Sequence, residues 1–224
     1  MNRSLIMTLM RKDWDLYKRA IISLLVLGII GLGIVVLGRT QFTFIIGGVL
    51  LITAIIILGC VLVQASIAGE RKEQHLAFVM SLPVTAREYS WAKIIFCLTA
   101  YSVVWALLVA AASYVVLGSP IPDGMMALFV PMFLALWCCM ALMTGVSIVS
   151  ESMQATVIIM TACNIGINFF LFSIVRIPDI GSQFDSPTLT FTGPIYALLG
   201  AELLFIVVTI GLTLYLQCRK TDFI

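Results

Sequence analysis

Charged residues are scarce in this sequence. Only 11% of its 224 residues are Asp, Glu, Lys or Arg, a single His occurs, and 62% of the residues are hydrophobic. This composition excludes both an ordinary soluble domain and intrinsic disorder. The formal net charge of +2 points to no particular partner. We therefore expect a single all-helical integral membrane domain over residues 1–224.

Motifs for nucleotide and metal binding are lacking as well. The sequence contains no Gly-x-x-x-x-Gly-Lys-Ser/Thr run, the loop that holds ATP phosphates. The six cysteines form no Cys-x-x-Cys pair, and His75 is distant from all of them in sequence. We interpret the cysteines as small buried apolar residues and expect no metal, cofactor or catalytic residue in this chain.

Six apolar runs are long enough to cross a hydrocarbon core of about 30 Å. They cover residues 20–38, 44–68, 94–117, 125–149, 155–175 and 195–217. The predicted fold is thus a bundle of six transmembrane helices, with spans one and two in 20–68 and spans three to six in 94–217. Residues 218–224 form a short tail.

The segment before the first run, residues 1–19, is basic and amphipathic. Leu5, Ile6, Leu9 and Met10 recur at helical spacing among several Lys and Arg residues. This pattern is typical of a helix in the headgroup plane. A secretory signal fits poorly, because the apolar run that follows is too long and no small-x-small cleavage site follows it.

Lys and Arg residues predict the orientation of the bundle. They concentrate in residues 1–19, 69–93 and 218–224, which an even number of spans places on one side of the membrane. The other side keeps only Arg39 and Arg176. We therefore predict that both termini are cytosolic.

Residues 69–93 form the longest polar segment between apolar runs. Burying a charge such as those in Glu70-Arg71-Lys72-Glu73 at the centre of a membrane helix costs roughly 2.5–3.5 kcal/mol, so the segment should lie in water. Pro83 interrupts the helical pattern, and Thr85 to Glu88 has the spacing of a capping box. A helix restarting there would run into span three. Any cytosolic loop of a membrane protein can share this composition.

The order of residues in 69–93 is more specific. Glu-Arg-Lys-Glu, a Ser-Leu-Pro turn, a nearby Arg and a Lys entering the next span resemble the signature of type-2 ATP-binding-cassette (ABC) transporter permeases, with an ABCG-like exporter fold. The resemblance implies a coupling helix that contacts a separate ATPase. It assigns this interface to Glu70, Arg71, Glu73, Leu82, Pro83, Arg87 and Lys93. It also implies two ABC ATPase subunits, which carry ATP and Mg, and a second permease chain, identical or homologous.

Polar residues share one face of span five. Thr161, Asn164 and Asn168 follow helical spacing, with Phe172 one turn further on. They could hydrogen bond between helices or line a pathway. In the family, spans two and five face the dimer axis, and this implies a substrate pathway formed by Thr53, Asn164, Asn168, Phe169 and Phe172.

Glu202 is the exception to the charge-free interior of the spans. Its carboxylate could reach the outer surface, pair with Arg176, or serve a substrate or proton. Residues 176–194 before the last span mix helix breakers with apolar residues, and predict either a small outer gate or an ordinary exposed loop.

Together these features favour the permease subunit of an ATP-driven ABC exporter that works by alternating access in the bacterial inner membrane. The uncharged interior suits an amphipathic or antimicrobial peptide, with lipid or hydrophobic drug as alternatives. An ion-coupled secondary transporter using Glu202 is a further class. A membrane-bound enzyme would need clustered catalytic groups, which the sequence does not show. No feature indicates nucleic acid.

Overall fold

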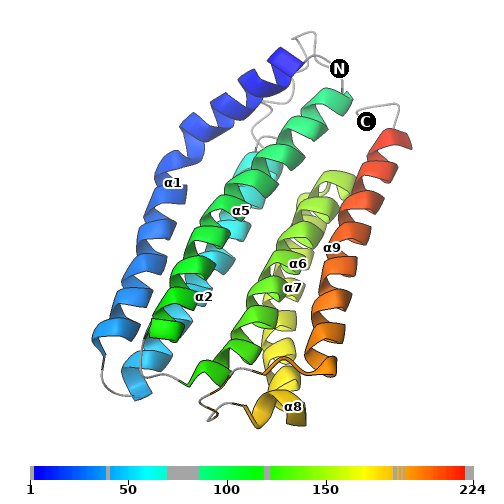
Figure 1. Cartoon of the computed structure of the whole chain (residues 1–224). Helices are drawn as coiled ribbons and strands as arrows, with labels where there is room; N and C mark the ends of the chain where they lie inside the picture. The colour runs from blue at the N-terminus through cyan, green and yellow to red at the C-terminus, as the bar shows by residue number, and fades with distance from the viewer. Residues whose placement is uncertain are drawn as a thin grey trace.

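A computed structural model of the chain describes residues 3–38, 41–69, 86–118, 122–183, 186, 188 and 190–219. These residues form helices and no strand (Figure 1). Six helices are long and apolar enough to cross a membrane, which confirms the predicted number of spans. They are α1 (Arg3–Leu37), α2 (Gln41–Val63), α5 (Ala86–Gly118), α6 (Met126–Ser150), α7 (Met153–Val175) and α9 (Gly193–Arg219). Three short elements are the π-helix η1 (Gln64–Gly69), the 3-10 helix η2 (Asp123–Met125) and α8 (Pro178–Gly181).

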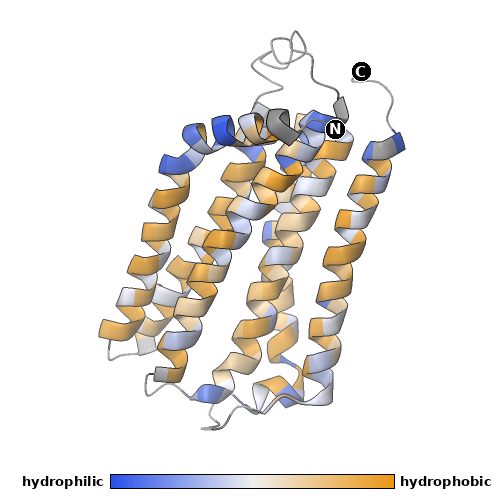
Figure 2. Ribbon diagram, turned by 45° about the horizontal axis from the view of Figure 1, so that its top comes forward, coloured by the Kyte–Doolittle hydropathy of each residue, from blue (hydrophilic) through white to orange (hydrophobic). Residues whose placement is uncertain are grey.

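The first helix is longer than a membrane span. α1 is continuous from Arg3 to Leu37, so residues 1–19 and span one are not separated by a break in helical structure. Figure 2 shows that its hydrophilic first part crosses one end of the bundle, and that the apolar part then runs along the other helices. A location of the first part in the headgroup plane stays a prediction.

α6 is the central helix of the bundle. It packs against α5, α7 and α9, whereas α1 packs along α2 and α5. In the most apolar stretch of each helix, 56% of α6 is buried, against 17% of α7 and of α9. α7 and α9 therefore present most of their apolar surface to lipid or to another protein.

Two pairs of helices approach each other at glycines. A Cβ atom added to Gly31 of α1 would lie 2.9 Å from the carbonyl oxygen of Gly47 in α2, so the two backbones are in contact. Gly145 of α6 leaves room for the hydroxyl of Thr213 in α9. Small residues at these positions allow close helix packing in the membrane.

The connection between α7 and α9 is packed against the bundle. Ile180 of α8 is fully buried and forms a small apolar cluster with Ala127, Ile174 and Ile195. The side-chain amide of Gln183 donates to the carbonyl of Asp179 at 2.7 Å and is itself buried. This end of the bundle lies opposite the start of α1 and the end of α9 (Figure 1). Ile180 and Gln183 therefore attach the described part of the connection to the bundle, and an outer gate stays a prediction.

Candidate functional site

A buried ion pair joins the polar part of α1 to the beginning of α5. The Nζ atom of Lys93 lies 2.7 Å from Oδ2 of Asp13, and these side chains are only 2% and 1% exposed. The same Nζ lies 5.5 Å from the centre of the Tyr89 ring. Cation, carboxylate and aromatic ring thus fix α5 to α1 about two turns after α5 begins.

The end of span two is attached at the same place. The hydroxyl of Tyr17 in α1 donates to the carbonyl of Ala65 in η1 at 2.8 Å. The Oγ atom of Ser66, also in η1, lies 3.0 Å from the Sγ atom of Cys97 in α5. A π-helix presents its residues at a different angle from an α-helix, and such turns are frequent at functional sites. We call these contacts, together with Asp13–Lys93, the α1–η1–α5 junction.

The junction lies close to both ends of the segment predicted to contact an ATPase. η1 ends at Gly69 and α5 begins at Ala86, so one helix of the junction leads into the intervening segment and another leads out of it. Five predicted interface residues lie outside the described residues, namely Glu70, Arg71, Glu73, Leu82 and Pro83. Arg87 lies in the first turn of α5, and its side chain is outside the described part as well. Lys93 is described, but its ammonium faces Asp13 within the chain and not an outer surface.

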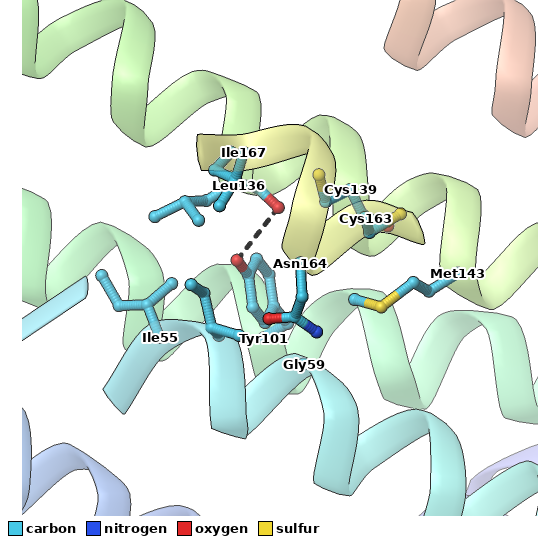
Figure 3. A pocket seen from close by; sticks show the side chains of 10 residues that line it. Ile55, Gly59, Tyr101, Leu136, Cys139, Met143, Cys163, Asn164 and Ile167 are labelled. Carbon is cyan, nitrogen blue, oxygen red and sulfur yellow. Dashed lines mark hydrogen bonds between the residues drawn. The ribbon is translucent and has the colours of Figure 1, made fainter. Parts of the chain in front are cut away.

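A small cavity lies where α2, α5, α6 and α7 meet (Figure 3). Its walls include Gly59, Tyr101 and Asn164, and the Tyr101 hydroxyl donates to the Leu136 carbonyl at 3.2 Å. The volume is about 20 Å³, which is room for about one water molecule. This space is too small for a peptide, lipid or drug.

The predicted pathway residues lie mainly on the outside of the bundle. Phe169 and Phe172 are each 69% exposed, and Asn168 and Thr53 are exposed as well. Asn164 is half-buried at the cavity, where its amide donates to the Met160 carbonyl at 2.8 Å.

The same amide of Asn164 lies 3.8 Å from Sγ of Cys60, which brings α7 beside α2. Thr53 shares a helical face with Cys60, because seven residues make nearly two turns. The predicted residues on both helices therefore border one surface, which we call the α2/α7 face. Asn168 donates within its own helix, to the Asn164 carbonyl at 2.8 Å, rather than to another helix.

Comparison with known proteins decides the family. The family model described as ABC-2 type transporter matches residues 1–185, which is most of the chain. The chain belongs to the ABC-2 type transporter family. No curated protein and no solved structure matches it. The family that the signature in residues 69–93 predicted is therefore confirmed.

Membership gives this ABC-2 permease its general role. With six apolar helices it is a multi-pass membrane protein, the permease component of an ABC transporter. Proteins of this kind work with ABC ATPase subunits and are generally not catalytic themselves. The matched range ends before α9, so the last helix of the permease is not part of the match.

Glu202 of α9 was expected either to reach the outer surface or to pair with Arg176, and it does neither. Its side chain is 7% exposed, so it does not reach the outer surface. Neither carboxylate oxygen has a hydrogen-bond partner among the residues that the structure describes, so the pair with Arg176 is not formed. Arg176 is exposed at the end of α7.

Sequence reasoning missed Asp13 as the partner of Lys93. A signal was present, since Asp13 lies on the same helical face as Ile6 and Tyr17, at spacings of seven and four. An acidic residue within an apolar stripe indicates a buried partner.

Proposed function

We propose that the chain pairs with a second permease chain, identical or homologous, and with two ABC ATPase subunits, as an ATP-driven exporter of the bacterial inner membrane. Membership of the ABC-2 family supports this proposal most directly. The α2/α7 face adds support, because a single chain encloses only about 20 Å³ beside it. A second chain across this face would turn exposed polar and aromatic residues into the lining of a pathway.

In this proposal ATP and Mg bind to the ATPase subunits, and the permease responds to their closure. The ATPases contact residues 69–93, including Glu70, Arg87 and their neighbours. Because the junction fixes both ends of this segment, a push on it moves α1, η1 and α5 together. Different contacts with the ATPases in their open and closed states then favour inward- and outward-facing arrangements.

The cargo that best suits the α2/α7 face is an amphipathic or antimicrobial peptide. Thr53, Asn164 and Asn168 offer hydroxyl and amide groups, and Phe169 and Phe172 offer aromatic surface. None of these five side chains is charged, so the face can hold apolar and polar groups without a fixed ion. Lipids and hydrophobic drugs are alternative cargoes of the same kind of exporter.

Transport in a defined membrane tests the proposal. Inside-out proteoliposomes with the permease and its ATPase are given a fluorescent amphipathic peptide, a fluorescent phospholipid or a hydrophobic dye. We expect ATP-dependent accumulation of the peptide, and none with a non-hydrolysable nucleotide or with ATPase alone. Transport of only the lipid or the dye would overturn the peptide assignment. Peptide uptake that needs a proton gradient, Glu202 and no ATPase would support the secondary transporter instead.

Cross-linking tests the second chain separately. Phe172→Cys places a thiol on the α2/α7 face, and Val207→Cys places one on α9, where the native residue is 67% exposed. We expect a short bifunctional reagent to give a dimer band with Phe172→Cys beyond that of the parent protein. An equal band with Val207→Cys, or no added band with Phe172→Cys, would argue against this face as the contact.

A further inference from the structure

A second, larger cavity lies between α6, α7 and α9. Its volume is about 330 Å³, within the range of small-molecule sites. α7 and α9 each pack on α6 but make little contact with each other, and this leaves a groove between them. Gly166, Ala201 and Phe205 border the groove and are exposed, so it is open to the outside of the bundle.

Glu202 is the acidic residue that lines this groove. The other lining residues are Ala135, Cys138, Cys139, Leu142, Gly166, Ile167, Phe170, Ala201 and Phe205. The Glu202 side chain is more than nine-tenths buried, and both of its oxygens lack a partner among the described residues. An ionised carboxylate in apolar surroundings costs free energy unless a cation or a hydrogen-bond donor pairs with it or a proton neutralises it.

α9 is held firmly at this position by α6. Cys138 Sγ donates to the backbone carbonyl of Glu202 at 3.5 Å, and the Gln217 amide donates to the Ile148 carbonyl at 3.0 Å. Between these two points Thr213 packs on Gly145. The groove and its carboxylate are therefore a formed site, and not the result of a loosely placed helix.

We propose that this groove binds a hydrophobic organic cation, whose charge pairs with the Glu202 carboxylate and whose apolar body lies against Phe170 and Phe205. Charge complementarity selects a cation, and the apolar lining selects a hydrophobic one. Glu202 lies nine residues after Gly193, roughly 14 Å along α9 from its first residue. This depth favours a small free cation over a lipid amine, which stays near the interface. The groove shares the wall residues Cys139 and Ile167 with the small cavity of Figure 3, but it opens between α7 and α9 rather than at the α2/α7 face. Binding there does not depend on the proposed peptide export.

Equilibrium binding of tritiated tetraphenylphosphonium to the full-length chain in phosphatidylcholine nanodiscs tests the proposal, with empty nanodiscs as background. Tetraphenylborate, of similar shape and opposite charge, is the ligand control. We expect saturable binding of the cation only, and a loss of at least about tenfold in affinity in Glu202→Gln, since an ion pair in a poorly polar site is strong. Glu151→Gln, at the exposed link between α6 and α7, should bind like the parent.

Filling the groove gives a second test that leaves the carboxylate in place. A Cβ atom at Gly166 or at Gly200 would meet no atom within 4 Å, so both positions accept a larger side chain. Gly166 lines the groove and Gly200 does not. We expect Gly166→Leu to abolish binding and Gly200→Leu to retain it. The proposal would be overturned if the parent shows no saturable binding, or if Glu202→Gln and Gly166→Leu bind the cation as tightly as the parent. Failure of peptide transport would leave this result unaffected.

Discussion

Lys93 and Asp13 lie 80 residues apart in sequence and form an ion pair of 2.7 Å that is almost completely buried. The pair connects a helix that crosses one end of the bundle with the helix that leaves the coupling segment. Burying two charges costs hydration free energy, which only a close partner offsets. Each charge therefore holds the other, and the two helices, in one arrangement.

Removing one member of this pair should destabilise the permease far more than breaking an exposed pair. For Asp13→Asn or Lys93→Met we expect a loss of about 3–5 kcal/mol, because the remaining charge stays buried. The exposed pair Asp15–Lys18 has the same 2.7 Å separation and is a matched control. Asp15→Asn should cost less than about 1 kcal/mol. Thermal unfolding in detergent measures all three variants, and similar melting temperatures would contradict the prediction.

The contact between α1 and α2 gives a second prediction about stability. Gly31→Ala places a methyl group against the Gly47 backbone and should cost about 1–3 kcal/mol, because backbone cannot move aside as a side chain can. Gly33→Ala, two residues on, meets nothing within 4 Å. It should be neutral or stabilising by up to about 1 kcal/mol, since Ala favours helix over Gly. Denaturation of both variants by increasing SDS compares them, and equal midpoints would refute the assigned contact.

The number of spans could be predicted from the sequence because the cost of burying charge applies to each run on its own. Apolar runs and polar interruptions therefore identify six helices without knowledge of how they pack. The boundary at residue 19, between the interfacial segment and span one, stays a prediction, because it marks a change of environment and not of backbone structure. Polarity changes there, but no Gly or Pro interrupts the helix, so the backbone continues while the environment changes.

Contacts between helices could not be predicted in the same way, because they depend on the rotation and register of both partners. Gly31 and Gly47 form no Gly-x-x-x-Gly motif, since each helix contributes one glycine. The resemblance to the family signature assigned Lys93 to an interface with the ATPase. Its buried partner Asp13 lies 80 residues earlier in the sequence, so the local pattern around Lys93 could not indicate this pair. Glu202 was recognised as unusual, but its groove requires knowledge that α7 and α9 flank α6 without closing on each other.

Substitutions on the α2/α7 face should change transport without changing stability. Asn164→Leu and Asn168→Leu remove amides that would face cargo in the proposed dimer. The loss of a contact worth about 1.4 kcal/mol would lower export roughly tenfold. Thr99→Leu is the control, because Thr99 is exposed on α5, outside the α2/α7 face, and its hydroxyl donates within its own helix to the Ile95 carbonyl at 2.6 Å. Export and cargo-stimulated ATP hydrolysis are measured together. Unchanged values in both Asn variants would remove these residues from the pathway.

Charge reversal in the predicted coupling segment should separate ATP hydrolysis from export. For Glu70→Lys and Arg87→Glu we expect normal membrane insertion, because both positions belong to the polar segment between spans two and three. In the proposed interface, Glu70 and Arg87 each face an opposite charge on the ATPase, so each reversal replaces attraction with repulsion. Closure of the ATPases would then no longer favour one arrangement of the permease. ATP hydrolysis should continue while export falls to background in the same proteoliposomes. Lys220→Glu, in the tail, changes the charge on the same predicted face and should export normally. Normal export by both Glu70→Lys and Arg87→Glu would mean that these two residues do not transmit the closure of the ATPases.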